Sequence, residues 1–434
     1  MRKPRLLVPI AIVLSIPLTI ALSACAGAPS ALDASGPDAV TDAAAADAGL
    51  TDGGPAEGSL ADGTAGDLPA RDGGAVDRSS DAAPCPPFTI DGWAWELVDV
   101  DYIGGAPIYP NLTLDPNDTP VAVFTKGTRN ERFAAVSWFS GGAWTAAEIV
   151  EQQPGRYLGK RPSLAIDASF GLHVTAYDED GQNLRYAWRP APGPWQAEVI
   201  YPPSADIDAG DHSSLVFGAD GRLHLSFHEY TGHRLIYGVK DAGLWTFEVV
   251  AEPGVSSSLA LDGSGTPQLA YFTGEHLGYA VRGAAGWVTE PVDESSDAIG
   301  HYPTLTLDRD GTPYTAYLRW PADTSAVKVA RKLSGTWSTE IVDDNLGITY
   351  TTGIALLPCG DLAVAYARTE GVGTGGLWFA YQNPGAGTWS RHSVDSAALA
   401  SGIDMVVDRR GTVHIIYLDE GTLTLRHARL MRVR

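Results

Sequence analysis

The chain has only three cysteines in 434 residues, and they lie far apart, at Cys25, Cys85 and Cys359. This spacing excludes a disulfide-dense scaffold and leaves no close cysteine pair for a structural zinc site. The sequence also lacks a glycine-rich phosphate loop after a strand and lacks a nucleophile elbow. After residue 90 no segment sustains the helical spacing of apolar residues, so we expect the folded part to be all-β.

Basic residues are also scarce. Lysine and arginine number 30 against 52 aspartates and glutamates, which gives a formal net charge of −22. A protein this acidic is repelled by nucleic acid and by anionic lipid surfaces. We therefore expect no nucleic-acid partner, and contact with a membrane only through an anchor.

A sequence repeat of about fifty residues recurs along the chain. Its clearest landmark is the motif Trp-x-x-Glu-x-Val or a near match. The tryptophans lie at intervals of 51, 51, 50, 42, 50 and 52 residues. They are Trp93, Trp144, Trp195, Trp245, Trp287, Trp337 and Trp389. Four short segments with alternating apolar residues fit within each interval, and this length is typical of a four-stranded propeller blade.

Counting the segments predicts seven blades and a closed ring. After Ser401 the chain ends without a tryptophan strand, whereas Trp93 to Val98 forms one with no blade of its own. Pairing the two ends of the chain removes the exposed sheet edges. An aromatic residue also recurs late in each second strand, where we expect it to pack blade against blade. These aromatics are Phe124, Tyr177, Phe227, Tyr271, Tyr317, Tyr366 and Tyr417.

The first residues form an export signal. Arg2, Lys3 and Arg5 precede an apolar run that ends in Leu22-Ser-Ala-Cys25, which is typical of a secretory signal. These four residues resemble the lipobox of bacterial lipoproteins. The resemblance implies cleavage before Cys25, attachment of acyl chains such as palmitate to it, and an address at the outer membrane or the cell surface.

A linker separates this anchor from the propeller. Between Ala26 and Ala83 there are ten aspartates and one glutamate against Arg71 and Arg78, with almost no aromatic residues. A segment of this composition buries too little apolar surface to fold and is expected to be disordered. The predicted organisation is a signal peptide over residues 1–24, the lipidated cysteine and linker over 25–86, and the propeller over 87–434.

The two remaining cysteines lie in places that a propeller brings to one face. Cys85 precedes the closing strand, and Cys359 lies in a turn between the first and second strands of the sixth blade. In an exported protein we expect them to form a disulfide that secures the closure of the ring. Two unpaired thiols are the alternative.

The blades differ most just before their first strands, at positions that ring the mouth of the central channel on the opposite face. Aromatic rings there suit sugar rings or peptide side chains, and the basic residues form a local positive spot. The candidate ligand-binding residues are Tyr109, Lys160, Arg161, Asp211, His212, His301, Tyr302 and Tyr350. Ordinary solvated loop residues are the alternative.

The third blade contains a cluster of histidines and carboxylates that is a candidate metal site. His228 and His233 have one residue too many between them for the helical zinc-protease motif, and the segment is expected at a strand end. A simpler zinc site would combine His212, His228 and His233 with Asp211 or Glu229. We expect surface histidines instead, and neither a metal nor another cofactor.

The repeat itself resembles a known group. Its pattern is seen in Leu259 to Gly265, Tyr271, Leu277 to Ala280 and Gly286 to Glu290. It resembles the repeats of exported bacterial propellers grouped with the sialidase superfamily, over about residues 90–434. The chain lacks the Ser-x-Asp-x-Gly-x-x-Trp boxes of sialidases. Lectin-type propellers with repeats of similar length imply sugar binding as a function that this fold supports.

Three functions follow, and the first is the main prediction. It is a monomeric, lipid-anchored and non-catalytic module of the cell envelope, which binds a glycan or an envelope or extracellular protein through the channel mouth. A glycosidase or lyase acting on polysaccharide is the second, and it would require paired carboxylates or a His/Tyr pair on that face. The available acids, Glu179, Glu229 and Asp419, belong to different blades. The third is a structural envelope protein.

Overall fold

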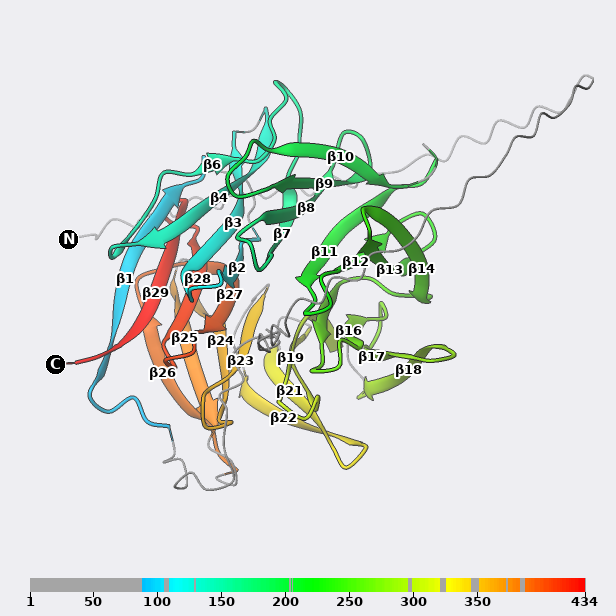
Figure 1. The fold of residues 1–434 in the computed structure, drawn as a ribbon. Helices are drawn as coiled ribbons and strands as arrows, with labels where there is room; N and C mark the ends of the chain where they lie inside the picture. The colour runs from blue at the N-terminus through cyan, green and yellow to red at the C-terminus, as the bar shows by residue number, and fades with distance from the viewer. Residues whose placement is uncertain are drawn as a thin grey trace, which may run out of the picture. The chain divides into compact units, whose positions relative to one another are not determined.

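The structure is a computed structural model that describes residues 88–433 apart from 105–108, 129, 203, 205, 296–298, 321–324, 345–350, 372–373 and 383–386. Every regular element in this part of the chain is a β-strand, and Figure 1 shows the strands arranged as blades around a centre. No helix long and apolar enough to cross a membrane occurs among these residues.

The strands form seven sheets, one for each blade. Blade 1 contains β2 (Asn111–Leu114), β3 (Pro120–Gly127), β4 (Arg132–Ser140), β5 (Ala143–Trp144) and β6 (Glu148–Ile149). Blade 2 contains β7 (Lys160–Ile166), β8 (Leu172–Asp178), β9 (Asn183–Arg189) and β10 (Gln196–Tyr201). Blade 3 contains β11 (Ala209–Phe217), β12 (Leu223–Glu229), β13 (Arg234–Asp241) and β14 (Leu244–Ala251). Blade 4 contains β15 (Ser257–Leu261), β16 (Pro267–Phe272), β17 (Leu277–Gly283) and β18 (Gly286–Asp293).

The last three blades complete the ring. Blade 5 contains β19 (Ile299–Leu307), β20 (Pro313–Arg319), β21 (Ala326–Leu333) and β22 (Thr336–Asp344). Blade 6 contains β23 (Thr352–Leu356), β24 (Leu362–Gly371), β25 (Thr374–Gln382) and β26 (Ser390–Asp395). Blade 7 contains β27 (Ala400–Val407), β28 (Val413–Asp419), β29 (Thr424–Arg432) and, from the start of the domain, β1 (Trp93–Tyr102).

Closure by the two ends of the chain is confirmed. Strand β1 pairs antiparallel with β29, from Trp93 opposite Arg432 to Tyr102 opposite Thr424. Figure 1 shows these two strands side by side, blue against red. Blade 7 is therefore built from both ends of the domain, as the count of tryptophan strands predicted.

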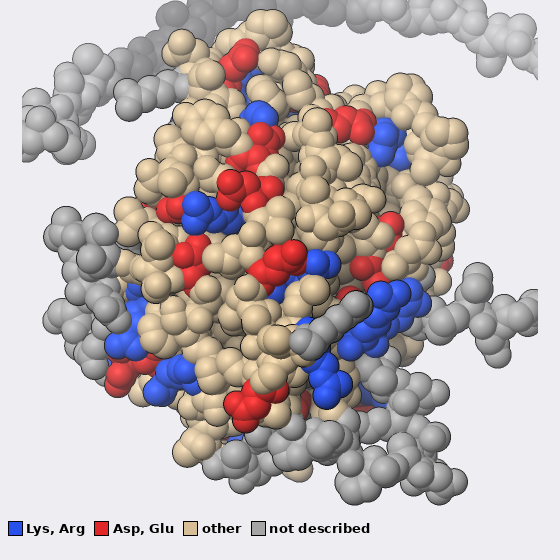
Figure 2. Space-filling model, turned by 90° about the vertical axis from the view of Figure 1, so that its left-hand side faces the viewer, with Lys and Arg blue, Asp and Glu red and all other residues tan. Residues whose placement is uncertain are grey.

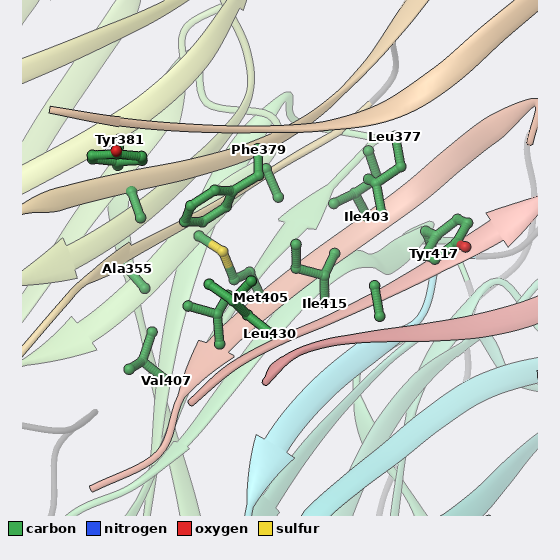
Figure 3. Packing of buried hydrophobic residues seen from close by; sticks show 14 of the residues in the cluster. Ala355, Leu377, Phe379, Tyr381, Ile403, Met405, Val407, Ile415, Tyr417 and Leu430 are labelled. Carbon is green, nitrogen blue, oxygen red and sulfur yellow. The ribbon is translucent and has the colours of Figure 1, made fainter. Parts of the chain in front are cut away.

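The core lies between neighbouring blades. Between blades 6 and 7, side chains of β25 interdigitate with those of β27 and β28, and Figure 3 shows Phe379 beside Met405 and Ile415. The once-per-blade aromatics of the second strands are all buried; six belong to clusters of this kind, and the seventh, Tyr177, donates its hydroxyl to Asp208 just before blade 3 at 2.8 Å. Their predicted role in packing blade against blade is confirmed.

Small polar residues link the first strands around the centre. A backbone N–H of one blade donates to a side-chain oxygen of the blade before it, as Leu215 does to Ser163 Oγ at 2.9 Å. The same contact recurs from Leu164 to Asn111, from Leu259 to Ser214, from Leu305 to Ser258 and from Leu112 to Asp404. Each such bond satisfies a backbone donor that would otherwise be buried without a partner.

The Trp-x-x-Glu landmark has a structural explanation. Trp337 Nε1 donates to Glu290 of the blade before it at 2.7 Å. Trp287 donates to Glu248 at 2.9 Å and Trp195 to Glu148 at 2.7 Å in the same way. In these three pairs the glutamate of one repeat is the partner of the next repeat's tryptophan, whereas the indole nitrogens of Trp144, Trp245 and Trp389 have no hydrogen-bond partner.

Charged side chains are mixed on the outside of the ring. Figure 2 shows the side of the molecule that lies at the left of Figure 1, where acidic and basic residues alternate without a large patch of one sign. Several pairs link strands of one blade, such as Arg429 with Glu96 and Arg426 with Asp99. On this side the surface offers no single-sign field for a charged polymer.

The signal peptide, the acylated Cys25, the linker and Cys85 lie outside the described residues, so they stay predictions. The chain just after Cys85 does run beside the turn that contains Cys359. Phe88 N donates to Asp361 Oδ2 at 3.0 Å, and the Phe88 ring meets Tyr381 edge-on at a centroid distance of 4.9 Å.

This placement supports the predicted disulfide and suggests its test. Peptide mapping of the non-reduced protein is expected to show Cys85 linked to Cys359, and a Cys359→Ser variant is expected to lose about 2–5 kcal/mol of unfolding free energy. Full alkylation of both thiols in the native exported protein would contradict the disulfide. The matched control is Ser169→Ala, because Ser169 is an exposed turn residue.

Candidate functional site

Three of the candidate residues occupy one equivalent position in three blades. Arg161, His212 and Tyr302 have φ values of +46°, +55° and +48°, in the left-handed region that side-chain-bearing residues rarely adopt. Each lies in a β-bulge of the first strand, where the pairing register shifts within β7, β11 and β19. In blade 7 the equivalent residue is Gly402, with φ +54°.

The bulges correct the sequence-based placement. These residues were expected in loops before the first strands, but they lie within strands that begin earlier, at Lys160, Ala209 and Ile299. A bulge inserts an extra residue and redirects its side chain. Strained, non-glycine conformations persist only where surrounding contacts enforce them, and they cluster at functional sites.

Asp211 supplies many of those contacts. Its side chain is fully buried, and its Oδ2 accepts from Arg161 Nη1 at 2.7 Å and from Tyr230 OH at 2.7 Å. Lys160 Nζ lies 3.3 Å from the same oxygen. The backbone N–H of His212 donates to Oδ1 at 2.8 Å, which holds the bulge. Asp211 therefore binds groups of both blade 2 and blade 3 and leaves none of its oxygens to solvent.

The charges at this point set the protonation states. Burial acts to raise the pKa of Asp211, but His212, Arg161 and Lys160 outweigh it and hold that pKa below its usual range. Burial, followed by the charge of Arg161, lowers the pKa of His212 to about 3. The imidazole of His212 is thus neutral at physiological pH.

Aromatic rings extend the site across blades 1 to 5. The Arg161 guanidinium lies over the Tyr109 ring, 4.2 Å from its centroid. The His212 and Tyr302 rings are 5.9 Å apart, and His301 lies 6.3 Å from Tyr302. These side chains form one continuous set, which we call the mouth cluster. It comprises Tyr109, Lys160, Arg161, Asp211, His212, His301 and Tyr302.

Of the eight predicted ligand-binding residues, Tyr350 alone lies outside the described residues. Sequence reasoning missed Trp320, whose ring lies 6.1 Å from His301, and Phe272, whose ring lies 4.1 Å from His301. It also missed Tyr230. These residues end the second strands or follow them, where the copies of the repeat also differ, so the signal that identified the mouth positions could have found them.

His228 lies beneath the cluster with its ring nitrogens unpaired. It is the cross-strand neighbour of Asp211, only 2% of it is exposed, and neither nitrogen has a hydrogen-bond partner. Its ring meets Tyr230 at a centroid distance of 4.3 Å. Burial lowers its pKa to about 4. His233, by contrast, is exposed.

A metal centre does not form from these groups. Within the described ranges, no set of three or more His, Cys, Asp or Glu side chains is arranged to hold a metal ion. Glu229, the carboxylate weighed with the histidines, is buried and binds Arg234 and Tyr201, the latter at 2.9 Å. Its Oε1 also accepts from the backbone N–H of Gly232 in the turn that leads into β13.

His228 gives the protein a testable pH dependence. A histidine whose folded pKa lies below its usual 6.5 contributes stability that is present above about pH 6.5 and is lost as the pH falls toward 4. We expect His228→Phe to reduce this acid loss by about 2–3 kcal/mol, measured as unfolding free energy between pH 7 and pH 4. His233→Gln is the control, because His233 is exposed. An unchanged slope in His228→Phe would contradict the assignment.

Comparisons with known proteins agree on the fold. No family model matches the chain, and no curated protein matches it. Among solved structures, an ulvan lyase described as a new family of polysaccharide lyase is similar with a TM-score of 0.50 and 11% identity, over 77% of this chain and 94% of that one. An inactive virginiamycin B lyase from Staphylococcus aureus with quinupristin has a TM-score of 0.49 and 11% identity, over 77% and 99%.

A mutant of the NanB sialidase from Streptococcus pneumoniae is similar with a TM-score of 0.43 and 11% identity, over 75% of this chain and 68% of that one. The predicted seven-bladed architecture is confirmed by the seven sheets themselves. At such identities the similarity shows architecture alone, and the chain is a seven-bladed β-propeller whose structural neighbours include sialidases and polysaccharide lyases.

Proposed function

We propose that the protein is a recognition module of the cell envelope that binds a glycan through the mouth cluster. The observation that carries the proposal is the set of bulges that hold Arg161, His212 and Tyr302 at one position of three blades. Repeat proteins place packing residues in every copy and binding residues where the copies differ. A requirement for these side chains at this spot explains why large residues occupy a conformation that favours glycine inside three first strands.

The chemistry of the cluster favours a sugar polymer of low charge. Tyrosine and histidine rings offer apolar faces with hydrogen-bonding tips, which suit pyranose rings. The guanidinium of Arg161 is already paired with Asp211, and Lys160 lies near both Asp211 and Glu179. These cations supply directed donors rather than a strong net field, and the acidic chain does not attract polyanions.

The backbone itself provides a sharp test. Glycine adopts positive φ without strain, so His212→Gly with Tyr302→Gly removes both side chains and leaves the bulges intact. On an array of neutral and acidic envelope polysaccharides, we expect this double variant to lose at least about tenfold in affinity. Phe170→Gly, at φ +65° in the turn between β7 and β8, is the matched control and keeps full binding.

Three results would contradict the proposal. They are glycan binding that the double variant retains, loss of binding in the control, and absence of glycan binding by the folded wild-type protein. Binding of an envelope protein in place of a glycan would assign the same face to a protein partner.

Polysaccharide cleavage by elimination is the second candidate, because the structure brings a histidine and a tyrosine together at the mouth. In that reaction His212 would take the proton next to a uronate carboxylate, the bond to the leaving oxygen would break as a double bond forms, and Tyr302 would protonate that oxygen. A pKa of about 3 makes His212 a weak base at neutral pH. Binding is therefore the better-supported function. If incubation of the protein with a uronate polysaccharide produces new ultraviolet absorbance from unsaturated sugar ends, cleavage becomes the better-supported function.

The anchor belongs to the same proposal. Acylation at Cys25 and the acidic linker would hold a monomeric propeller at the outer membrane or the cell surface, with reach toward polymers of the envelope. Metabolic labelling with a palmitate analogue is expected to mark the wild-type protein and not Cys25→Ser.

A further inference from the structure

A second site is indicated where the contacts between neighbouring blades break their symmetry. We call each such contact region, between the fourth strand of one blade and the next blade, a seam. In six fourth strands a bulged valine or isoleucine precedes a residue that faces the following blade, and in blade 1 Val150 and Glu151 hold these positions just after β6. In six blades that residue is acidic or a tyrosine. The six are Asp101, Glu151, Tyr201, Asp293, Asp343 and Asp395, and the seventh, in blade 3, is Ala251.

The six polar residues all bind the next blade. Between blades 4 and 5, Asp293 accepts from Tyr317 OH at 2.6 Å and from Lys328. The seam between blades 6 and 7 repeats this arrangement, because Asp395 accepts from Tyr417 OH at 2.7 Å and from Arg426 at 3.1 Å. The other contacts are Asp101 with Lys126, Glu151 with Arg185, Tyr201 with Glu229, and Asp343 with Tyr366.

The seam between blades 3 and 4 lacks both the carboxylate and the cation of this arrangement. Tyr271 stands where Tyr317 and Tyr417 stand, but Ala251 carries no carboxylate to accept its hydroxyl. The cross-strand neighbour of Tyr271 is Gly278, at the position that Lys328 and Arg426 occupy in their blades. The ion pair that fills the equivalent space between blades 4 and 5 and between blades 6 and 7 is therefore absent here.

A cavity of about 250 Å³ lies beside Gly278 on this side of blade 4. The side is that of blade 3, since Tyr271 and Ala280 pack against Leu235 and Val250. A Cβ atom on Gly278 would lie 2.6 Å from Tyr271 Cζ, so the ring leans over the glycine. The polar groups and the aromatic residue that line the space belong to Tyr271, Thr273, His276, Thr289, Glu290 and Glu294.

The lining selects the ligand chemistry. Three hydroxyls, an imidazole and two carboxylates can exchange hydrogen bonds with several hydroxyl groups, while Pro291 offers apolar surface. The volume lies below the ~300–1,000 Å³ of sites for drug-sized molecules. We propose that this cavity binds a single neutral sugar residue, at a site separate from the mouth cluster.

The repeat supplies the test, because the chain contains the filled version of the seam. Ala251→Asp with Gly278→Lys rebuilds the residues of the seam between blades 4 and 5. Saturation-transfer NMR with methyl glucoside, methyl galactoside and methyl mannoside is expected to detect binding of at least one sugar to the wild-type protein. The double variant is expected to lose about tenfold or more in affinity.

A second variant avoids the risk that the rebuilt seam misfolds. Glu294→Gln changes one exposed side chain and is also expected to weaken binding about tenfold. The mouth variant His212→Gly/Tyr302→Gly should bind the same sugar as the wild type does, which separates this proposal from the proposed function. If the wild-type protein binds none of the three sugars, the second site is overturned. Wild-type affinity in either seam variant, or a loss confined to the mouth variant, would overturn it as well.

Discussion

A chain that starts at residue 103, without β1, is expected not to fold into a stable propeller. Strand β1 pairs with β29 along its whole length, and the Trp95 ring contacts Phe379 at a centroid distance of 5.3 Å. Trp93 and Phe88 pack against the same cluster between blades 6 and 7. Partial burial of these three large side chains contributes several kcal/mol, since full burial of each would contribute about 1.5–3 kcal/mol. This is comparable with the ~5–15 kcal/mol that stabilises a typical domain.

Circular dichroism melting and limited proteolysis measure this effect. The truncated chain should show no cooperative melt and should be cleaved first around β29, whose edge is then unpaired. The matched control begins at residue 88 and is expected to melt as the full chain does. Adding residues 88–102 as a separate peptide should restore part of the protection. A cooperative melt of the truncated chain at the temperature of the control would show that the ring does not depend on its closure.

The fold could be predicted because its determinants are local and repeated. Alternating strands, turn residues and the tryptophan landmark occur in every copy, so the count of blades and the missing strand of blade 7 were visible in the sequence. The partner of each landmark was not visible. The hydrogen bond from Trp337 to Glu290 joins two different repeats. Only the closed ring of blades places these two residues side by side.

The mouth residues lie at positions where the copies differ, as the sequence indicated, but their backbone conformation could not be predicted. Nothing in the types Arg161, His212 and Tyr302 indicates a positive φ, because the usual signal is glycine or asparagine. The burial of Asp211 was hidden for a similar reason. Its compensating cation, Arg161, is fifty residues away in another blade, so no local pattern distinguishes this carboxylate from a solvated one.

The seam between blades 3 and 4 is a second feature that no local sequence pattern reveals. Ala251 and Gly278 are ordinary strand residues when each is considered alone. Their significance appears only when the bulge register equates Ala251 with Asp293 and the cross-strand pairing equates Gly278 with Lys328. A symmetric fold therefore lets the absence of a group be detected, because the six other seams carry a polar residue where Ala251 stands and two of them carry a cation where Gly278 stands.

Replacing Asp211 with alanine is expected to have the largest effect of any single substitution in the mouth cluster. The change leaves Arg161 and Lys160 without their buried partner, and the loss of one member of a buried pair costs about 3–5 kcal/mol. It also removes the acceptor of the Tyr230 hydroxyl and of the His212 backbone N–H. Both the stability of blades 2 and 3 and the geometry of the bulge should suffer.

A double-mutant cycle separates the two effects. Arg161→Gly retains the left-handed backbone, so Asp211→Ala combined with Arg161→Gly should be less destabilised than the sum of the single variants, by about 1–3 kcal/mol. Chemical denaturation measures the cycle, and the glycan array measures binding on the same proteins. We expect Asp211→Asn to recover part of the stability and little of the binding, since a neutral amide accepts hydrogen bonds but does not balance Arg161. Additive losses, or an Asp211→Ala variant within about 1 kcal/mol of wild type, would show that the carboxylate does not organise the mouth.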